Sequence, residues 1–585
     1  MQAQALRDVL SMRSAAAGPT IGGFVVDSQA APRAWGNARH LVGGEVEVLG
    51  LFDLVEGRPE DLLDADGDFP AWNRWRGRWC FVRREGPGGR WLAVTDHFGS
   101  LPLFHTAYGD RLVVGSQLAP LLGLPWCERR VDPEAVFHFL NFGCIPAPFT
   151  IAEEIRALGP GEQLCAHGGF IEVRRWWQPV YGEDLDGDPA TLAGVLRERM
   201  EDTVERYRPR GEARWGCFLS GGTDSSSIVG LLSRQSEAPV DAFSIGFAEA
   251  GYDELAFAGI AADAFGANSH RGSIDETETL DVLQRLCELF EQPFGNASAV
   301  PTRACAGMAA GRDCSILLAG DGGDEIFGGN ERYAKDRWMQ AFHALPSPVR
   351  AVANGVGRAV SGGRVRLLNR VGNFTRRASL PNPDRFYTDD AFASEHFEAM
   401  MGPALSPALS PDLSLAFMRQ LYDQGQAGEA LHRLMALDLE MAIARNDLVK
   451  VDGACRHAGI SARFPYLDPD LVAFTGRLGA RMKLRGMDKR HLFKRAVADL
   501  LPRAIIEKPK QGFGLPIAVW IRRNAAFRDW MRAILLDARS VQRGWFQPGF
   551  VRDLFERHVA GAWDYSAVLW QLTVLELWTR RNLDA

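Results

Sequence analysis

The clearest pattern of hydrophobic and polar positions lies in the middle of the chain. Apolar Cys217, Phe218 and Leu219 precede a Gly-Gly pair, and a serine run follows at 225–227. A short uninterrupted apolar run is typical of a strand that is covered on both faces. From Ile228 onward the apolar positions return at helical spacing. The sequence therefore predicts a strand, a glycine turn and a helix.

Two further segments fit an α/β arrangement. Residues 240–247 form a mostly apolar run that ends in small residues, and residues 317–330 repeat the order of strand, glycine-rich turn and acidic positions. In an open α/β sheet, ligands bind outside the carboxyl ends of the strands. We therefore expect Ser244, Gly246 and Phe247 to lie near a ligand.

The first part of the chain has a different pattern. Strand-like segments separated by turns fill it until a helix signal begins at Asp132-Pro133. Residues 1–18 are rich in Ala, Gln and Ser and are predicted to be an extension. Residues 191–207 have helical spacing, and the last third of the chain is predicted to be mostly helical. The predicted strands of the first part are 21–26, 46–52, 79–82, 91–95 and 112–114.

Composition narrows the class of protein. Of the 585 residues, 46% are hydrophobic and 24% are charged, which predicts a globular chain of two or three domains. The net charge of −7 disfavours nucleic acid as a partner. Nine scattered cysteines without a Cys-x-x-Cys pair indicate neither a disulfide framework nor a zinc site. No apolar run reaches the ~18 residues of a membrane helix, so we expect a cytoplasmic protein without membrane contact.

The glycine turn after the first predicted strand has the chemistry of an anion site. Glycine lets backbone N–H groups close around an anion, and a helix N-terminus favours phosphate. No lysine follows the glycines, so the turn is not a Walker A loop. A strand, turn and helix without a ligand is the alternative. The residues concerned are Ser220, Gly221, Gly222, Asp224, Ser225 and Ser226.

Several motifs together resemble the asparagine synthetase superfamily. Residues 220–226 (SGGTDSS) resemble the SGGxDS pyrophosphate loop of ATP pyrophosphatases, and residues 317–330 resemble the S-G-E-G-S-D-E-x-F-G-G-Y motif of asparagine synthetases. Residues 75–83 and 95–104 resemble the glutaminase domain of these enzymes, and residues 508–516 resemble their R-x-K-x-G-F-x-x-P motif. The resemblance covers nearly the whole chain.

This resemblance implies a fold and a reaction. Residues 19–185 would form a degenerate glutaminase-like domain, an Ntn-hydrolase-like β-sandwich. Residues 186–585 would form an α/β ATP-pyrophosphatase domain of the adenine-nucleotide α-hydrolase type, with a parallel sheet and a helical C-terminal part. The implied enzyme is a carbon–nitrogen ligase that uses ATP and Mg²⁺. It converts a carboxylate to an acyl-adenylate, releases pyrophosphate and lets an amine displace AMP.

The resemblance also implies roles for individual residues. Asp224 and Asp324 match ligands of a phosphate-bound Mg²⁺, and Lys510 matches a lysine that neutralises charge on the α-phosphate. Asp321 is a candidate general base, and a loop carboxylate that only orders the turn is the alternative. Lys450 is a further catalytic candidate, with a salt bridge as the alternative. The candidates for nucleotide binding outside the first glycine turn are Ser244, Gly246, Phe247 and Gly320.

Three departures from the superfamily pattern bear on function. A working glutaminase of this class exposes a cysteine as its first residue, whereas that position here falls on or near Pro19 and no cysteine occurs before Cys80. We therefore expect that glutamine is not hydrolysed and that the amine comes from elsewhere. Asn296 stands where relatives have an Asp, and Ser461 where they have a Glu, which points to a different acceptor.

Within the superfamily the chain most resembles lasso-peptide cyclases. These join the α-amine of a core peptide to an Asp or Glu side chain, and an amine with a pKa near ~8 has less need of a strong base. The implied partners are the precursor peptide, a leader peptidase and a leader-recognition protein. The alternatives are a β-lactam- or carbapenam-type cyclase, an ammonia-dependent asparagine synthetase, and a catalytically silent scaffold that binds nucleotide or a partner.

Two charged segments have more than one interpretation. Asp253 and Glu254 resemble a Y-D-E turn of the superfamily, and an exposed helix-capping pair is the alternative. Residues 350–377 contain seven arginines. We expect a solvated face there, with contact to an acidic peptide segment as the alternative.

Overall fold

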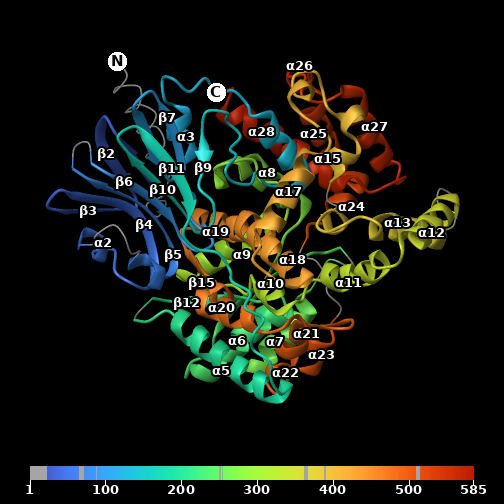
Figure 1. The fold of residues 1–585 in the computed structure, drawn as a ribbon, viewed down its shortest axis with the longest axis horizontal. Helices are drawn as coiled ribbons and strands as arrows, with labels where there is room; N and C mark the ends of the chain where they lie inside the picture. The colour runs from blue at the N-terminus through green and yellow to red at the C-terminus, as the bar shows by residue number, and fades with distance from the viewer. Residues whose placement is uncertain are drawn as a thin grey trace.

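Figure 1 shows strands gathered on one side of the molecule and helices around a second sheet on the other. The structure is a computed structural model. It describes residues 23–64, 71–86, 89–211, 213–249, 252, 254–360, 366–387, 391–508 and 514–584. The predicted extension at 1–18, Asp253 and the candidate lysine Lys510 lie outside these residues.

Two antiparallel sheets make up the N-terminal part. One has the strand order β2-β1-β8-β7-β9 and the other β11-β10-β6-β5-β4-β3. Phe24 and Val114 of the first sheet and Leu49 and Cys80 of the second meet in one buried core, as the facing layers of a sandwich require. The strands are β1 (Gly23–Asp27), β2 (Ala30–Trp35), β3 (Arg39–Gly43), β4 (Val46–Glu56), β5 (Arg76–Glu85), β6 (Trp91–Thr95), β7 (Phe104–Tyr108), β8 (Arg111–Gly115), β9 (Arg156–Ala157), β10 (Glu162–His167) and β11 (Phe170–Arg175).

A parallel sheet forms the centre of the second part. Its order is β14-β13-β12-β15-β16, and each neighbouring pair runs parallel. The chain builds outward from β12 through β13 to β14 and then returns to the other side of β12. The gap between β12 and β15 is therefore a topological switch point, where open α/β sheets bind ligands. The strands are β12 (Trp215–Phe218), β13 (Asp241–Gly246), β14 (Asn268–Ser273), β15 (Ile316–Leu318) and β16 (Ser461–Arg463).

Helices cover this sheet and fill the C-terminal part. α7 and α9 pack against β13, and α19 packs against α9. Asp132 and Asp188 cap α4 and α5 by accepting hydrogen bonds from backbone N–H groups of the first turn, and each helix begins with a proline. The helices used below are α4 (Pro133–Phe142), α5 (Pro189–Tyr207), α6 (Thr223–Gln235), α7 (Leu255–Phe265), α9 (Ala299–Ala310), α10 (Gly323–Phe327), α11 (Glu331–His343), α12 (Ser347–Val360), α13 (Arg366–Ala378), α18 (Ala430–Asp438), the π-helix Leu439–Asp447, α19 (Leu448–His457), α21 (Ala480–Lys483), α22 (His491–Ala496), α25 (Ala525–Leu536), α26 (Ala538–Gln542) and α28 (Ser566–Asn582).

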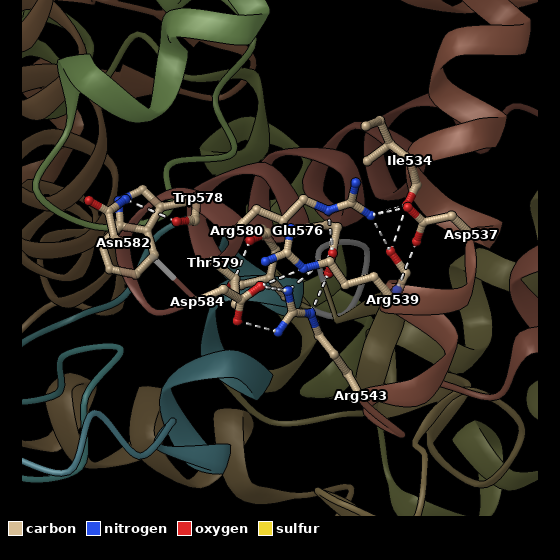
Figure 2. Close-up of polar contacts among 12 residues, drawn as sticks. Ile534, Asp537, Arg539, Arg543, Glu576, Trp578, Thr579, Arg580, Asn582 and Asp584 are labelled. Atoms are coloured by element: carbon tan, nitrogen blue, oxygen red, sulfur yellow. Dashed lines mark hydrogen bonds and ion pairs between the residues drawn. The ribbon is translucent and has the colours of Figure 1, made fainter.

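The last helix, α28, is buried and anchored by ion pairs. Arg543 and Arg580 both bind Glu576, with Nε–O distances of 2.8 and 2.6 Å, and Arg580 also reaches Asp537 at 2.7 Å (Figure 2). Asp584 pairs with Arg543 from the end of the chain. These contacts tie α28 to the residues on either side of α26.

The architecture confirms the predicted fold class: a β-rich N-terminal sandwich followed by an α/β part with a parallel sheet and a helical C-terminal part. Within the described ranges, no helix is both long enough and apolar enough to cross a membrane.

Candidate active site

A cavity of about 540 Å³ lies at the carboxyl edge of the parallel sheet. Residues that follow β12 and β15 line it, which places it at the switch point described above. Further lining residues come from α9, from the junction of the π-helix with α19, and from the segment 487–508. Both predicted glycine turns therefore face one cavity.

The first glycine turn connects β12 to α6. Gly222 occupies the N-cap position of α6, and the hydroxyl oxygens of Ser220 and Ser225 lie 3.0 Å apart across the turn. Gly221 has a φ of 69°, and a Cβ there would lie 2.4 Å from the backbone nitrogen of Ala258. Glycine is thus required so that the turn can pack against α7.

Four of the six residues predicted for this turn line the cavity, and two do not. The lining residues are Ser220, Gly222, Asp224 and Ser225. Gly221 faces α7, and Ser226 is fully buried on the inner face of α6. Because neither Gly221 nor Ser226 lines the cavity, their direct role in nucleotide binding stays a prediction.

The second glycine turn connects β15 to α10 and fits closely against the first. A Cβ on Gly323 would lie 2.6 Å from Oδ1 of Asp224, and one on Gly320 would lie 2.8 Å from the backbone nitrogen of Ser225. Gly322 has a φ of 94°. Gly320 and Gly323 are therefore needed because the start of α6 lies directly against them, whereas a Cβ on Gly322 would lie 2.4 Å from the side chain of Leu467.

Asp224 and Asp324 meet at a single arginine. Nη2 of Arg490 donates to Oδ2 of Asp224 and to Oδ1 of Asp324. A Cβ on Gly329 would lie 2.0 Å from Oδ1 of Asp324, so a side chain there would displace this carboxylate. Arg490 has a φ of 55°, a left-handed conformation that is uncommon outside glycine and clusters at functional sites. The two carboxylates thus surround one positive charge.

The side chains around Arg490 suit the binding of a nucleotide together with Mg²⁺. Mg²⁺ is usually held by one or two carboxylates together with substrate phosphates. Among the residues that the structure describes, no group of three or more His, Cys, Asp or Glu side chains is placed to hold a metal. The hydroxyl oxygen of Thr223 is buried at the start of α6 and has no hydrogen-bond partner in the described part of the chain. A phosphate oxygen would supply that partner. The metal role of Asp224 and Asp324 stays a prediction.

Asp321 and Lys450 face each other in the same cavity. Nζ of Lys450 lies 2.7 Å from Oδ1 of Asp447 and 3.6 Å from Oδ1 of Asp321. Burial raises the pKa of Asp321 to about 6, although the charge of Lys450 acts in the opposite direction. Burial alone would lower the pKa of Lys450, but its two carboxylate neighbours raise it above its ordinary value. Lys450 is therefore a permanent cation beside a carboxyl group that titrates near neutral pH.

Lys508 is a second buried cation at the cavity. Its Nζ lies 2.6 Å from Oε1 of Glu254 and 3.5 Å from the carbonyl oxygen of Ser220, above the ring of Phe257. Glu254 is 7% exposed and makes no capping hydrogen bond to α7. The alternative that Glu254 belongs to an exposed capping pair is therefore wrong. Its carboxylate holds Lys508 beside the first glycine turn, two positions before Lys510.

Of the three residues at the end of β13 that were expected to bind nucleotide, only one lines the cavity. Ser244 lines the cavity, but its hydroxyl group donates to the carbonyl oxygen of Leu219 at 2.6 Å. Gly246 pairs with Ser273 in the sheet and Phe247 packs in the core, so neither lines the cavity. Phe243 and Ile245 do line it. The ligand-facing part of this strand therefore lies earlier than predicted, because β13 extends past the cavity before it ends.

The residues that depart from the superfamily pattern lie behind the cavity wall. The amide nitrogen of Asn296 donates to Oδ1 of Asn446 at 2.7 Å, and its oxygen accepts from the backbone of Ser298, the residue before α9. Ser461 bonds to Asp53 and Arg78 of the N-terminal sandwich. Neither Asn296 nor Ser461 lines the cavity. They influence it only through neighbours.

The first cysteine of the chain is part of the sandwich core. Cys80 lies on β5, is completely buried, and burial raises the pKa of its thiol far above the ordinary value. A buried protonated thiol is not a nucleophile. The expectation that this domain does not hydrolyse glutamine stays a prediction.

Sequence reasoning missed Arg490 and the role of Lys508. Both are cations in charged runs that are typical of surface segments. The sequence around Arg490 gives no sign of its left-handed backbone. The apolar residues that follow Arg490 are the only signal that its neighbourhood is buried.

Comparison with known proteins adds a family to this geometry. The model described as "Asparagine synthase" matches residues 195–580, and the model described as "Glutamine amidotransferase domain" matches residues 69–177. A glutamine-hydrolyzing asparagine synthetase 1 of Bacillus subtilis is 23% identical over 92% of this chain and 83% of its own length. A putative glutamine-hydrolyzing asparagine synthetase of Mycobacterium bovis is 25% identical over the same shares.

A more distant relative carries a different name. Amidase chry2 of Gibberella zeae is 23% identical over 54% of this chain and 49% of its own length. The "Asparagine synthase" model alone spans well over half of the chain and includes both glycine turns and the Lys450 helix. The chain therefore belongs to the asparagine synthase family of ATP-dependent carbon–nitrogen ligases.

Proposed function

We propose that this protein activates an Asp or Glu side chain of a peptide with ATP and joins it to the α-amine of the same peptide, forming a macrolactam ring. One observation favours an amine that belongs to the substrate. The synthetase cavity has a full set of acidic and basic groups, whereas the first thiol of the amidotransferase-like domain is sealed in its core. An amine that arrives with the substrate fits this combination better than ammonia released from glutamine.

The chain's own groups divide the work of activation. Backbone N–H groups at the start of α6 and the hydroxyl group of Thr223 would hold the phosphates, and Lys508 lies beside the same turn. A carboxylate oxygen attacks the α-phosphorus, and the bond from that phosphorus to the pyrophosphate leaving group breaks. Asp224 and Asp324 would hold a Mg²⁺ ion, which would neutralise charge on the phosphates when bound.

Asp321 and Lys450 would serve the second step. The amine attacks the carbonyl carbon of the acyl-adenylate, and a proton must leave the amine as AMP departs. Asp321, with a pKa near neutral, is suited to accept that proton. Lys450 keeps its charge and is suited to stabilise the oxyanion that develops on the carbonyl oxygen.

The second candidate function uses the same activation with a smaller substrate. Ammonia-dependent asparagine formation or closure of a small-molecule lactam would need the same phosphate site, and the names of the bacterial relatives favour asparagine formation. These reactions differ from the proposal only in what brings the amine.

Incubation of the purified protein with MgATP and peptides that carry an Asp or Glu several residues from a free N-terminus tests the proposal. The expected product is lighter by one water and appears together with AMP and pyrophosphate. Release of ADP would contradict the activation chemistry. Pyrophosphate release stimulated by aspartate plus ammonium, but by no peptide, would replace the proposal with the second candidate. Asp324→Asn is the matched inactive control.

A further inference from the structure

The helices α11, α12 and α13 form an arm at the edge of the molecule. Figure 1 shows α12 and α13 side by side, away from the sandwich and from the parallel sheet. α13 packs against α12 and α11, and the rings of Phe342 and Phe374 meet edge to face at 5.9 Å between centroids. A hydrogen bond from Asn354 to Ser379 closes the pair. The arm is therefore held together by its own contacts.

One face of α12 is apolar and exposed. Val349, Val352 and Val356 are 50%, 68% and 57% exposed, and their i, i+3, i+7 spacing places them on one face of the helix. Leu345 and Trp338 add exposed apolar surface before it. A row of exposed apolar residues on one helix is unusual for a surface that meets only water.

The arm is also the most one-sided charged segment of the chain. Residues 337–383 contain no Asp or Glu, in a chain whose net charge is −7. The arginines in this segment are Arg337, Arg350, Arg358, Arg364, Arg366, Arg370, Arg376 and Arg377. A complementary partner must therefore combine acidic and apolar groups.

The arm is continuous with the rim of the active-site cavity. Met487 lines the cavity, and the indole N–H of Trp338 on α11 donates to its sulfur. Lys489, which also lines the cavity, pairs with Glu331 at the start of α11 at 3.3 Å. A polypeptide that leaves the cavity over Met487 would thus reach Trp338 and then the valine face.

From these observations the geometry points to the arm as a docking surface for an acidic, apolar segment of the polypeptide substrate. This inference rests on the proposed function, because it names the part of the peptide that lies outside the reacting carboxylate and amine. The 14 residues of α12 make a helix roughly 20 Å long. About six extended residues would cover it.

Other occupants fit the arm less well. Helices that lie in membranes carry Trp, Phe and Leu along one face, whereas the exposed apolar residues described on α12 are three valines. The larger Trp338 lies before α12 and is held at the cavity rim by Met487. Binding to a nucleic-acid backbone is driven by charge and does not require an exposed valine row. A second copy of this acidic chain would satisfy the charge but not the link to the cavity rim.

A binding measurement on the full-length protein tests the surface. The probe is a fluorescent peptide of alternating glutamate and leucine pairs, about 12 residues long, and its counterpart has lysine in place of glutamate. The double variant V352D/V356D should bind the acidic probe about tenfold more weakly than the wild type. R376Q should weaken binding less and reduce its dependence on salt. V42D is the matched control, because Val42 is 64% exposed on β3, far along the chain from the arm.

The alternatives give different results. Equal affinity of wild type and V352D/V356D for the acidic probe, or equal binding of the lysine probe, would overturn the inference. So would sedimentation of the wild type, but not of the variant, with phosphatidylglycerol vesicles in the absence of peptide binding, or loss of a dimer in the variant.

Kinetic measurements distinguish a failure of the docking surface from a failure of the proposed function. V352D/V356D should raise the KM for a cyclised peptide and leave kcat and ATP–pyrophosphate exchange unchanged, since no arm valine lines the cavity. If rings form and this KM does not change, the surface is wrong and the function stands. If no ring forms but the acidic probe still distinguishes the variant, the surface stands and the function is wrong.

Discussion

Replacing Asp321 with Asn tests the assignment of the general base. Asp321 follows β15, lines the cavity and lies 3.6 Å from the ammonium group of Lys450. The substitution preserves the size of the side chain and removes its ability to accept a proton. Loss of a positioned general base typically costs about 10²- to 10⁴-fold in rate. We expect the rate of amide formation by D321N at pH 7 to fall within that range, while ATP–pyrophosphate exchange is retained.

The pH dependence gives a sharper expectation. Burial raises the pKa of Asp321 to about 6, so the base is about 90% ionised at pH 7 and about 10% ionised at pH 5. The α-amine of the substrate titrates in the same assays, but it does so equally with both enzymes. The ratio of the wild-type rate to the D321N rate should therefore fall about tenfold between pH 7 and pH 5.

Single-turnover mass spectrometry of the cyclised peptide measures this ratio. Asp321→Glu is the control for charge, and it should recover part of the rate together with its pH dependence. Lys450→Met removes the cation that lowers the pKa of Asp321. In this background, the ratio of the rate with Asp321 to the rate with D321N should therefore have its midpoint above pH 6. A ratio that is constant from pH 5 to pH 7 would refute the base role. A midpoint that moves downward in K450M would refute the electrostatic account.

Three further substitutions test other parts of the structure. In R490M, Asp224 and Asp324 lose the cation that they share. Mg²⁺ without nucleotide should therefore raise the melting temperature of the variant and not that of the wild type. An equal rise in both proteins would show that Arg490 does not compete with the metal. Lys483 is 2% exposed, contacts His432 at 2.9 Å, and burial lowers its pKa to about 7. Because the pKa of Lys483 is lower in the folded state than in the unfolded state, the free energy of unfolding of the wild type should rise by about 1.4 kcal/mol per pH unit above pH 7. Calorimetric scans at pH 7 and pH 9 should show this rise in the wild type and not in K483M. R78M removes one of the two arginines that bind the buried carboxylate of Asp452 and leaves only Arg456, at 2.6 Å, so it should destabilise by about 3 kcal/mol. D452N should relieve part of that loss in the double variant; simple additivity of the two melting shifts would contradict the pairing.

Every strand that the sequence predicted in the N-terminal part has a buried face, although β7 and β10, which also bury residues, were not predicted. Residues 91–95 were predicted and are strand β6, all of which is buried. Strands β3 and β11 were not predicted; both lie at sheet edges, and every residue of β11 is exposed. Without a buried face a strand has no apolar alternation, so only pairing with its neighbour defines it.

The same difference separates the parts of the site that could be predicted from those that could not. The glycine turns carry a local signal, since only glycine fits the close approach of Gly323 to Asp224. Their convergence followed from the rule for strand ends in a parallel sheet. Arg490 and the Glu254–Lys508 pair come from segments far apart in sequence, and their positions depend on packing that no local pattern records.

The amidotransferase-like domain contributes to the site through position. Arg78 on β5 reaches Asp452 on α19 and Ser461 on β16, and the same guanidinium group binds Asp53 on β4 at 2.7 Å. Although burial acts in the opposite direction, Arg78 holds the pKa of Asp53 below its ordinary value, which favours the charged form of this carboxylate.

Both contacts of Arg78 lead directly to the catalytic candidates. Lys450 precedes Asp452 by two positions on α19, so one side of this helix faces the sandwich while another faces the cavity. Strand β16, which carries Ser461, pairs with β15, whose end leads into Asp321. The distance between Asp321 and Lys450 is therefore set by two elements that the same arginine of the N-terminal domain holds in place. This gives the domain a structural role that needs no thiol chemistry. It predicts that loosening the Arg78 network impairs amide formation more than nucleotide activation, because the hydrogen bonds of Arg78 go to Asp452, Asp53 and Ser461 and not to the first glycine turn.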